Sequence, residues 1–399
     1  MAPLGEPWRG VLDEVARARG WPGSASVREL GALVARLSEA YNEDGVLGAA
    51  AAELLPARVA FSFPRDVPKG AGAVRELVCA GLLRIPEDRP LSILDLGAGV
   101  GATTTGVVRA LAAAGHAGKV QATWKDGDAA ALRVGAEIAE RAPASPVALD
   151  VHTSVDDARR PQPLEHDLVL LGQVLSELDL ELPEAERVER HAGVLADLLR
   201  RSVRADGSLV VIEPALRARS RHLHAVRDAL AAAGHAPFAP CLHAGPCPAR
   251  IAETDWCHDD LAVDLPEWLV PVARSAGLRW QGLTFTYLVL RRDGATLARA
   301  LGPRPLRLRL VSSRMATKGK EEALVCGERG GAPVAGRLRV LDRDRAKAPG
   351  LAAFGAAERG DVLAPSPAVA SPLESFADGA RLGADVAIER LDLDPGRTA

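Results

Sequence analysis

The sequence has no apolar run long enough to cross a bilayer, although 48% of its 399 residues are hydrophobic. A transmembrane helix takes about 20 consecutive, mostly apolar residues, so we expect no membrane-spanning helix and no membrane partner. The first residues, MAPLGEPWRGVLDEVARARGW, also lack the apolar stretch of a secretory signal peptide. These absences predict a cytoplasmic protein, and the apolar content is enough for a sizeable core.

Cysteine is scarce, with five residues in the whole chain. An odd, low number argues against a secreted disulfide scaffold, and in a reducing cytosol clustered cysteines more often bind metal or do chemistry. Three of the five lie in one stretch, APCLHAGPCPARIAETDWCHDDL, at residues 239–261. That concentration makes this stretch a candidate functional site.

A strong net charge is also absent, because the formal net charge is −3 at pH 7. This total gives no overall nucleic-acid signal, and we expect no DNA partner. The charge is nevertheless uneven. Residues 291–320 carry nine Lys or Arg and one acid, Asp293, and LRARSRHLHAVR at 216–227 carries four arginines and no acid. These two segments predict a basic face on the second half of the chain.

The order of the predicted elements indicates a mixed α/β fold. Residues 1–90 have helical spacing, broken at Gly and Pro. From residue 91 short apolar strands alternate with helices, which predicts a parallel, doubly wound, Rossmann-like sheet over residues 91–295, with a cysteine-rich insertion at about 236–263. Alternating segments at 296–362 predict a small β-rich appendage, and the Ala/Pro/Ser-rich residues 363–399 predict a loosely ordered tail.

A glycine-rich loop, DLGAGVGATTTG, follows the first predicted strand of this domain and precedes a helix. Its glycines, Gly97, Gly99 and Gly101, allow a tight turn and let a ligand approach the backbone closely. The spacing differs from the dinucleotide fingerprint G-x-G-x-x-G. Together with Asp95 it resembles motif I of the class I S-adenosylmethionine-dependent methyltransferases.

This resemblance implies an S-adenosylmethionine site with three further contacts. Asp126, at the end of the second predicted strand, would accept the ribose hydroxyls, and Asp128 could replace it if that strand ends later. Asp150, at the end of the third strand, would contact the adenine, and Gln173, after the fourth, would lie near the methionine end. An Asn-Pro-Pro-Tyr motif of the amino methylases is absent after the fourth strand, so the acceptor stays open.

The cysteine spacings fit no common metal motif. Cys241, Cys247 and Cys257 are separated by five and nine residues, which is neither a zinc-finger spacing nor a common ferredoxin run. Thiolates suit either tetrahedral zinc or an iron–sulfur cluster, and both require a fourth ligand. Cys326 is the remaining candidate, because we interpret Cys79 as a buried core thiol; His243 and His258 could substitute and would favour zinc.

The segment EPALRARSRHLHAVRDALAAAGHAPFAPCLHAGPCPARIAETDWCH, residues 213–258, resembles the signature region of mitochondrial-type methyltransferase-like proteins of small ribosomal subunit assembly. The resemblance rests on Glu-Pro after the fifth strand and on Pro-Cys, Cys-Pro and Asp-Trp-Cys-His. It implies a 4Fe–4S cluster and binding of the small ribosomal subunit through its 16S ribosomal RNA. By position the cluster ligands would be Cys241, Cys247, Cys257 and Cys326.

This chain departs from the family at several places, among them Asp259, where the family has an aromatic, and FPRDVPKGAGAV in the N-terminal part. The proposed ligands are untouched by these changes. Two alternatives remain open: an assembly factor that keeps the fold without catalysis, and a small-molecule methyltransferase with a structural zinc site. In the first, the basic segments 217–227 and 291–320 would contact RNA phosphates.

Overall fold

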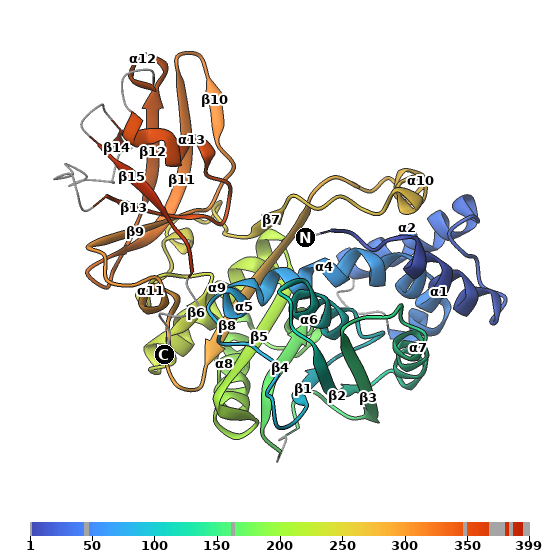
Figure 1. The fold of residues 1–399 in the computed structure, drawn as a ribbon. Coiled ribbons are helices and arrows are strands. Elements are labelled where there is room, and N and C mark those ends of the chain that lie inside the picture. The colour runs from blue at the N-terminus through green and yellow to red at the C-terminus, as the bar shows by residue number, and fades with distance from the viewer. Residues whose placement is uncertain are drawn as a thin grey trace.

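The computed structural model describes residues 2–43, 48–160, 164–345, 349–366, 380–382 and 386–393. It contains an N-terminal helical region, a central mixed sheet with helices on both faces, and a second sheet that stands beside the first (Figure 1). None of the helices in these described ranges is long and apolar enough to span a membrane.

The N-terminal region is helical, as its spacing predicts. Its α-helices are α1 (Glu6–Arg17), α2 (Val27–Glu43), α3 (Ala51–Ala57), α4 (Phe63–Ala73) and α5 (Arg75–Cys79), with a π-helical turn at Arg58–Ser62. Helix α4 packs directly against α6 (Ala102–Ala113), the helix that follows the glycine-rich loop. The N-terminal region therefore packs directly on the central-sheet domain.

The central sheet has the strand order β3-β2-β1-β4-β5-β8-β6, with β7 paired to β8. Strands β1 to β5 are parallel, whereas β8 runs antiparallel between β5 and β6. This order, with one antiparallel strand inserted next to β5, is that of the class I methyltransferases and confirms the predicted fold. The bounds are β1 Leu91–Leu96, β2 Gly118–Asp126, β3 Val147–Val155, β4 His166–Gly172, β5 Val203–Pro214, β6 Pro237–Ala239, β7 Asp259–Leu261 and β8 Leu283–Arg291.

Alternating side chains of the buried strands pack on the two faces of this sheet. In β1, Ile93 faces the cluster that includes helix α6, whereas Leu94 faces α8 (Glu184–Arg201) and α9 (Arg217–Ala232). Helix α7 (Ala129–Glu140) joins α1 in a further cluster. Both faces are thus covered, which leaves the carboxyl ends of the strands as the place for a site.

The C-terminal sheet has the order β14-β12-β11-β9-β13-β15, with β10 paired to β11. Its strands are β9 Leu306–Leu310, β10 Met315–Thr317, β11 Lys320–Arg329, β12 Ala332–Leu341, β13 Val362–Pro365, β14 Ala380–Arg381 and β15 Ile388–Leu391. The short helices α10 (Val270–Ser275), α11 (Leu297–Ala300), α12 (Asp342–Arg345) and α13 (Ala352–Ala356) complete the chain.

The prediction of a loosely ordered tail from residue 363 is wrong for the part of the tail that the structure describes. Strands β14 and β15 join the C-terminal sheet, because Leu363, Leu382 and Ile388 bury their side chains in its core. The other residues of the tail lie outside the described ranges. The β-rich appendage therefore continues past residue 362 and includes tail residues in its core.

A buried ionic network joins the two sheets. Glu76 accepts hydrogen bonds from Arg309 Nη1 at 2.9 Å and from the Tyr287 hydroxyl at 3.0 Å, and Arg75 pairs with Asp259 at 2.6 Å. Removing one partner of a buried pair typically costs about 3–5 kcal/mol, because it leaves an uncompensated charge. Asp259 thus supplies an ion-pair partner at this junction.

Candidate functional site

A cavity of roughly 960 Å³ lies at the carboxyl ends of the parallel strands. Its lining comes from the loops after β1, β2, β3 and β4 and from the helical region in front of the sheet. This is the position at which doubly wound sheets hold ligands. We refer to this cavity as the crevice.

The glycine-rich loop forms one wall of the crevice, and its three glycines differ in role. All three have left-handed φ angles, 69°, 54° and 80° for Gly97, Gly99 and Gly101. A Cβ at Gly97 would collide with Val174 and one at Gly101 with the Trp124 ring, whereas one at Gly99 would have Arg58 Nη2 as its nearest neighbour at 3.1 Å. Gly97 and Gly99 line the crevice; Gly101 does not, and it is required for packing against Trp124.

Asp126 lies at the end of β2, beside the glycine-rich loop. It accepts hydrogen bonds from the backbone N–H of Gly99 at 2.8 Å and of Asp128 at 2.7 Å. Asp128 instead caps α7 by accepting from Ala130 N and Ala131 N, both at 3.0 Å. Its other oxygen accepts from Arg58 at 2.6 Å, so Asp126 is the carboxylate held by the loop itself.

Asp95 and Asp150 lie away from the crevice lining. Asp95 is fully buried beneath the loop, where it accepts a hydrogen bond from Thr104 Oγ1 at 2.6 Å. Asp150 lies within β3 with an exposed side chain, so the prediction that it ends the strand is wrong. The β-branched residues in HTSV extend β3 to Val155, and Asp156 and Asp157, which sequence reasoning missed, line the crevice instead.

The environment of Asp95 makes a testable prediction about stability. Burial raises the pKa of this carboxyl to about 7. Because the folded state holds the proton more tightly than the unfolded chain, stability falls as pH rises from about 4 towards 7, by up to about 1.4 kcal/mol per pH unit. Asp95→Asn keeps an acceptor for Thr104 and removes this dependence. Denaturant unfolding across that pH range should show the free energy of unfolding of the variant rising relative to that of the wild type up to about pH 7. If the two free energies of unfolding change with pH in parallel, Asp95 does not titrate in this way.

Side chains at the end of β4 close the crevice opposite Asp126. Gln173, with a left-handed φ of 62°, donates from Nε2 to Asp66 at 3.1 Å and accepts from Lys69 Nζ at 3.4 Å. Glu213 accepts from the backbone N–H of Leu175 at 2.9 Å and so holds the loop after β4 in place. Gln173 thus lines the crevice, and so do Asp66 and Lys69, which sequence reasoning missed.

Glu177 is a further carboxyl on the lining that has a perturbed pKa. Burial, reinforced by Glu213 and Asp126, raises the pKa of Glu177 to about 7 despite the nearby Arg58. A carboxyl that titrates near neutral pH is suited to proton transfer or to donating a hydrogen bond. In the sequence, the only signal for Glu177 is its position in the segment Ser-Glu-Leu after the fourth predicted strand.

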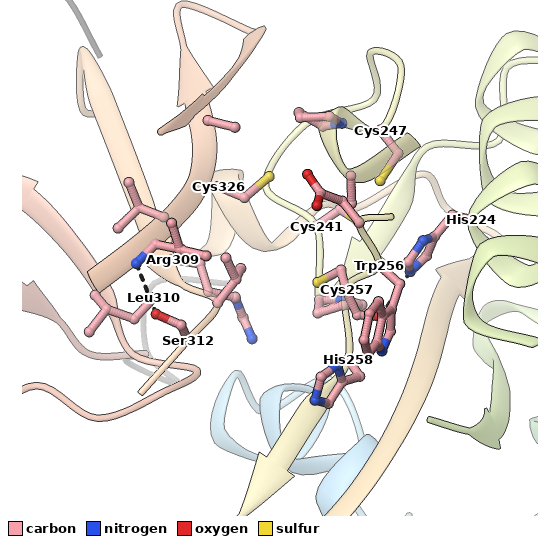
Figure 2. Close-up of a pocket in the computed structure, with 18 of the residues that line it drawn as sticks. His224, Cys241, Cys247, Trp256, Cys257, His258, Arg309, Leu310, Ser312 and Cys326 are labelled. Carbon is pink, nitrogen blue, oxygen red and sulfur yellow. Dashed lines mark hydrogen bonds between the residues drawn. The ribbon is translucent and has the colours of Figure 1, made fainter. Parts of the chain in front are cut away.

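The four predicted ligand cysteines line a second cavity, of about 800 Å³, between the cysteine-rich loop and the C-terminal sheet. Figure 2 shows the sulfur atoms of Cys247, Cys257 and Cys326 directed into the space between the loop and β11. All four are free thiols. Within the described ranges, no three His, Cys, Asp or Glu side chains have the arrangement of ligands around a single metal ion.

The thiols influence one another electrostatically. Burial, together with the neighbouring thiols, raises the pKa of Cys257 to about 12 and that of Cys247 to about 11. Burial and the other three cysteines also raise the pKa of Cys326 well above its usual value. A bound metal cation would instead lower the pKa of these thiols, because thiols that coordinate a metal lose their protons.

Side chains of α9 hold the cysteine-rich loop. Asp228 accepts from Cys247 N at 3.0 Å, Arg227 donates to the carbonyls of His243 and Gly245, and His224 Nε2 donates to the Cys257 carbonyl at 3.0 Å. His243 also places Nε2 3.6 Å from the Cys326 sulfur. The loop is therefore fixed in position by polar contacts and does not depend on regular secondary structure.

The profile of the family described as mitochondrial small ribosomal subunit Rsm22 matches residues 65–333, more than half of the chain. The chain belongs to the Rsm22 family. The resemblance at residues 213–258, which includes the cysteine-rich loop, is thereby confirmed at the level of the family. No curated protein sequence matches the chain.

Solved structures similar to this Rsm22-family chain include several methyltransferases. One is an S-adenosylmethionine-dependent methyltransferase from Agrobacterium tumefaciens, at 14% identity over 57% of this chain and 62% of that one, with a TM-score of 0.32. Another is a putative class I methyltransferase from Listeria monocytogenes, at 15% identity over 72% and 87%, with a TM-score of 0.35. The plantazolicin methyltransferase BpumL, solved with S-adenosylhomocysteine, has 10% identity over 67% and 98%, with a TM-score of 0.32. The fold assignment rests on the strand order and not on these low scores.

The basic segment 291–320 of this Rsm22-family chain is largely neutralised within the molecule, and two arginines of 217–227 are engaged in internal contacts. Seven of the nine cations in 291–320 pair with carboxylates, and the pairs are Arg291–Asp293, Arg292–Glu165, Arg304–Glu389, Arg307–Glu328, Arg309–Glu76, Arg314–Glu321 and Lys320–Glu322. In 217–227, Arg227 is buried, and Arg221 donates to the Ala252 and Asp255 carbonyls. The prediction of a basic face there overlooked these partners, which are mostly distant in sequence.

The prediction that Cys79 is a buried core thiol is wrong. Cys79 lies at the end of α5 and is exposed, although the apolar segment RELVCAGLL predicts a buried thiol. Its neighbours Leu77 and Ala80 occupy the core positions of this turn. Cys79 therefore serves as a natural reference cysteine outside the second cavity.

Proposed function

We propose that the chain is an S-adenosylmethionine-dependent methyltransferase that acts in the cytoplasm on the small ribosomal subunit. The observation that carries the proposal is the crevice itself. In a chain of the Rsm22 family, Gly97 and Gly99 expose backbone to a cavity at the carboxyl ends of β1 and β4, and Asp126 flanks it. Backbone without Cβ atoms beside a fixed carboxylate suits a nucleoside ligand.

When bound, S-adenosylmethionine would supply an electrophilic methyl group on its sulfonium. The chain's own task would then be alignment, because holding the acceptor in line with the methyl lowers most of the barrier. Asp126 keeps free lone pairs for the ribose hydroxyls, and Gly99 leaves room beside it. Glu177, which titrates near pH 7, could take a proton from the acceptor.

We also infer that Cys241, Cys247, Cys257 and Cys326 hold a 4Fe–4S cluster. Around one zinc, with Zn–S of about 2.3 Å, the four sulfurs would lie about 4 Å apart. A cubane cluster instead takes one thiolate on each of its four irons, so its ligand sulfurs are spread more widely. Four thiols that line one cavity would supply the four thiolates that such a cluster takes, and the buried Arg227 would offset part of their charge.

The cluster would have a structural role. Three of its ligands belong to the loop between β6 and β7, and the fourth is on β11 of the other sheet. Cross-linking these segments would fix the C-terminal sheet beside the methyltransferase domain, together with the ionic network of Glu76 and Arg309.

Methyl transfer to isolated small ribosomal subunits tests the proposed function. The chain should co-sediment with the particles and transfer label from methyl-labelled S-adenosylmethionine into their ribosomal RNA. Co-sedimentation without label in RNA or protein would instead identify a non-catalytic assembly factor. Absence of co-sedimentation at low salt would remove the ribosomal partner and favour a small-molecule acceptor.

A further inference from the structure

Helix α4 presents a charged face to the crevice. Arg65, Asp66 and Lys69 lie within one helical turn of one another, and all three line the cavity. Their helix is otherwise buried, and the side chains of Lys69 and Asp66 are only 7% and 16% exposed. Charges at such depth are expensive unless they have partners or a ligand.

Two of these charges form a closed triangle with Gln173. Lys69 Nζ lies 2.7 Å from Asp66 Oδ1, Gln173 Nε2 donates to Asp66 Oδ2 at 3.1 Å, and Lys69 donates to Gln173 Oε1 at 3.4 Å. The triangle links α4 to the end of β4. It therefore fixes a cation, an anion and an amide side by side on the crevice wall.

The position of α4 relative to the glycine-rich loop is also fixed. A Cβ at Gly70 would collide with the Thr103 carbonyl, and one at Gly106 with the Val67 carbonyl. The backbones of α4 and α6 therefore touch, and α6 begins directly after the loop. The charged face of α4 cannot shift without disturbing the loop that would hold the ligand.

Arg65 differs from its neighbours because its guanidinium has no hydrogen bond or ion pair with any residue in the described ranges. The charge of Arg65 contributes to lowering the pKa of both Asp66 and Lys69, yet neither side chain is in contact with it. Without a ligand, the set therefore carries one more positive than negative charge. A ligand that brings a carboxylate to Arg65 would complete it.

We propose that this set, Arg65, Asp66, Lys69 and Gln173, binds the zwitterionic α-amino-acid end of S-adenosylmethionine. Arg65 and Lys69 would receive the carboxylate, and Asp66 with Gln173 Oε1 would receive the ammonium group. The inference rests on the proposed function and deepens it. It assigns to α4 the selectivity between ligands with and without that end.

Two probes separate the amino-acid end from the rest of the cofactor. S-Adenosylhomocysteine carries it, and 5′-methylthioadenosine has the same nucleoside and thioether without it. Calorimetry on Arg65→Met should show S-adenosylhomocysteine binding weakened about tenfold or more, the usual effect of losing a charge-assisted bond, with methylthioadenosine affinity unchanged. Arg65→Lys should recover most of the loss. Arg133→Met, which removes an exposed arginine of α7 outside the crevice lining, is the matched control.

The outcomes distinguish this inference from the function on which it rests. Equal weakening of both probes in Arg65→Met, or of neither, would overturn the role of α4 while the methyltransferase proposal stands. Lys69→Met is a second test variant, and it should also lose affinity for S-adenosylhomocysteine but not for methylthioadenosine. Because Lys69 is buried, thermal unfolding should confirm that this variant is folded. A wild-type chain that binds neither probe would contradict the proposed function itself.

Discussion

Cys257→Ser is expected to lose the metal centre and to destabilise the C-terminal sheet. Cys257 follows the exposed Trp256 and directly precedes His258 and β7, and its sulfur faces Cys326 across the second cavity. Binding of a structural metal contributes directly to folding free energy, about 10–16 kcal/mol for zinc in zinc-finger peptides, so loss of one of the four ligands should weaken the link between the two sheets. The affected part should be the region from β9 onward, which contacts the loop through Cys326.

Metal and sulfide content per chain, together with limited proteolysis, measure this effect. The variant should contain little metal and should be cleaved between the two sheets faster than the wild type. Cys79→Ser is the matched control, since it makes the same chemical change at an exposed cysteine outside the cavity and should behave as wild type. Full metal stoichiometry in Cys257→Ser would remove this residue from the ligand set.

Gly99→Arg is expected to abolish binding of S-adenosylmethionine and S-adenosylhomocysteine without unfolding the chain. A side chain here would project into the crevice beside Arg58, because no backbone or core atom lies within the space that a Cβ would occupy. The left-handed φ of 54° adds a strain of about 1–2 kcal/mol. Gly101 cannot serve for this test, since any Cβ there enters the Trp124 ring and would disturb the core.

Calorimetric titration with S-adenosylhomocysteine measures the loss, and thermal unfolding confirms the fold. Gly115→Arg is the control: this glycine also has a left-handed φ, of 85°, but lies after α6 with open space around it. It incurs the same type of strain and should keep full affinity. Unchanged affinity in Gly99→Arg would show that the glycine-rich loop is no part of the cofactor site.

The local features of the crevice were predictable from sequence. The buried strand and the glycine-rich loop follow from period and spacing, and the resemblance to methyltransferase motif I points to the acid after the next strand. Gly97, Gly99 and Asp126 all line the crevice. Asp150 was misplaced because VALDV already has the length of a typical strand. Only the edge pairing of β3 with β2, which continues to Val155, sets the true end.

Features that depend on distant residues were not predictable. Arg309 is paired with Glu76 across 233 positions, and nothing local distinguishes such an arginine from one that faces RNA. The sequence did not show that α4 faces the crevice for the same reason, since Asp66 and Lys69 contact Gln173, which is distant in the sequence. The convergence of Cys326 with the loop cysteines was reached through the family resemblance and not through spacing.

We propose above that Cys241, Cys247, Cys257 and Cys326 form one metal centre between the cysteine-rich loop and β11 of this Rsm22-family chain. The most direct test is anaerobic purification of the wild-type chain, followed by iron, acid-labile sulfide and zinc analysis and a UV–visible spectrum. A 4Fe–4S cluster should give about four irons and about four sulfides per chain, together with a broad visible absorbance. Zinc in place of iron would contradict the cluster, and a chain without metal would contradict the centre itself.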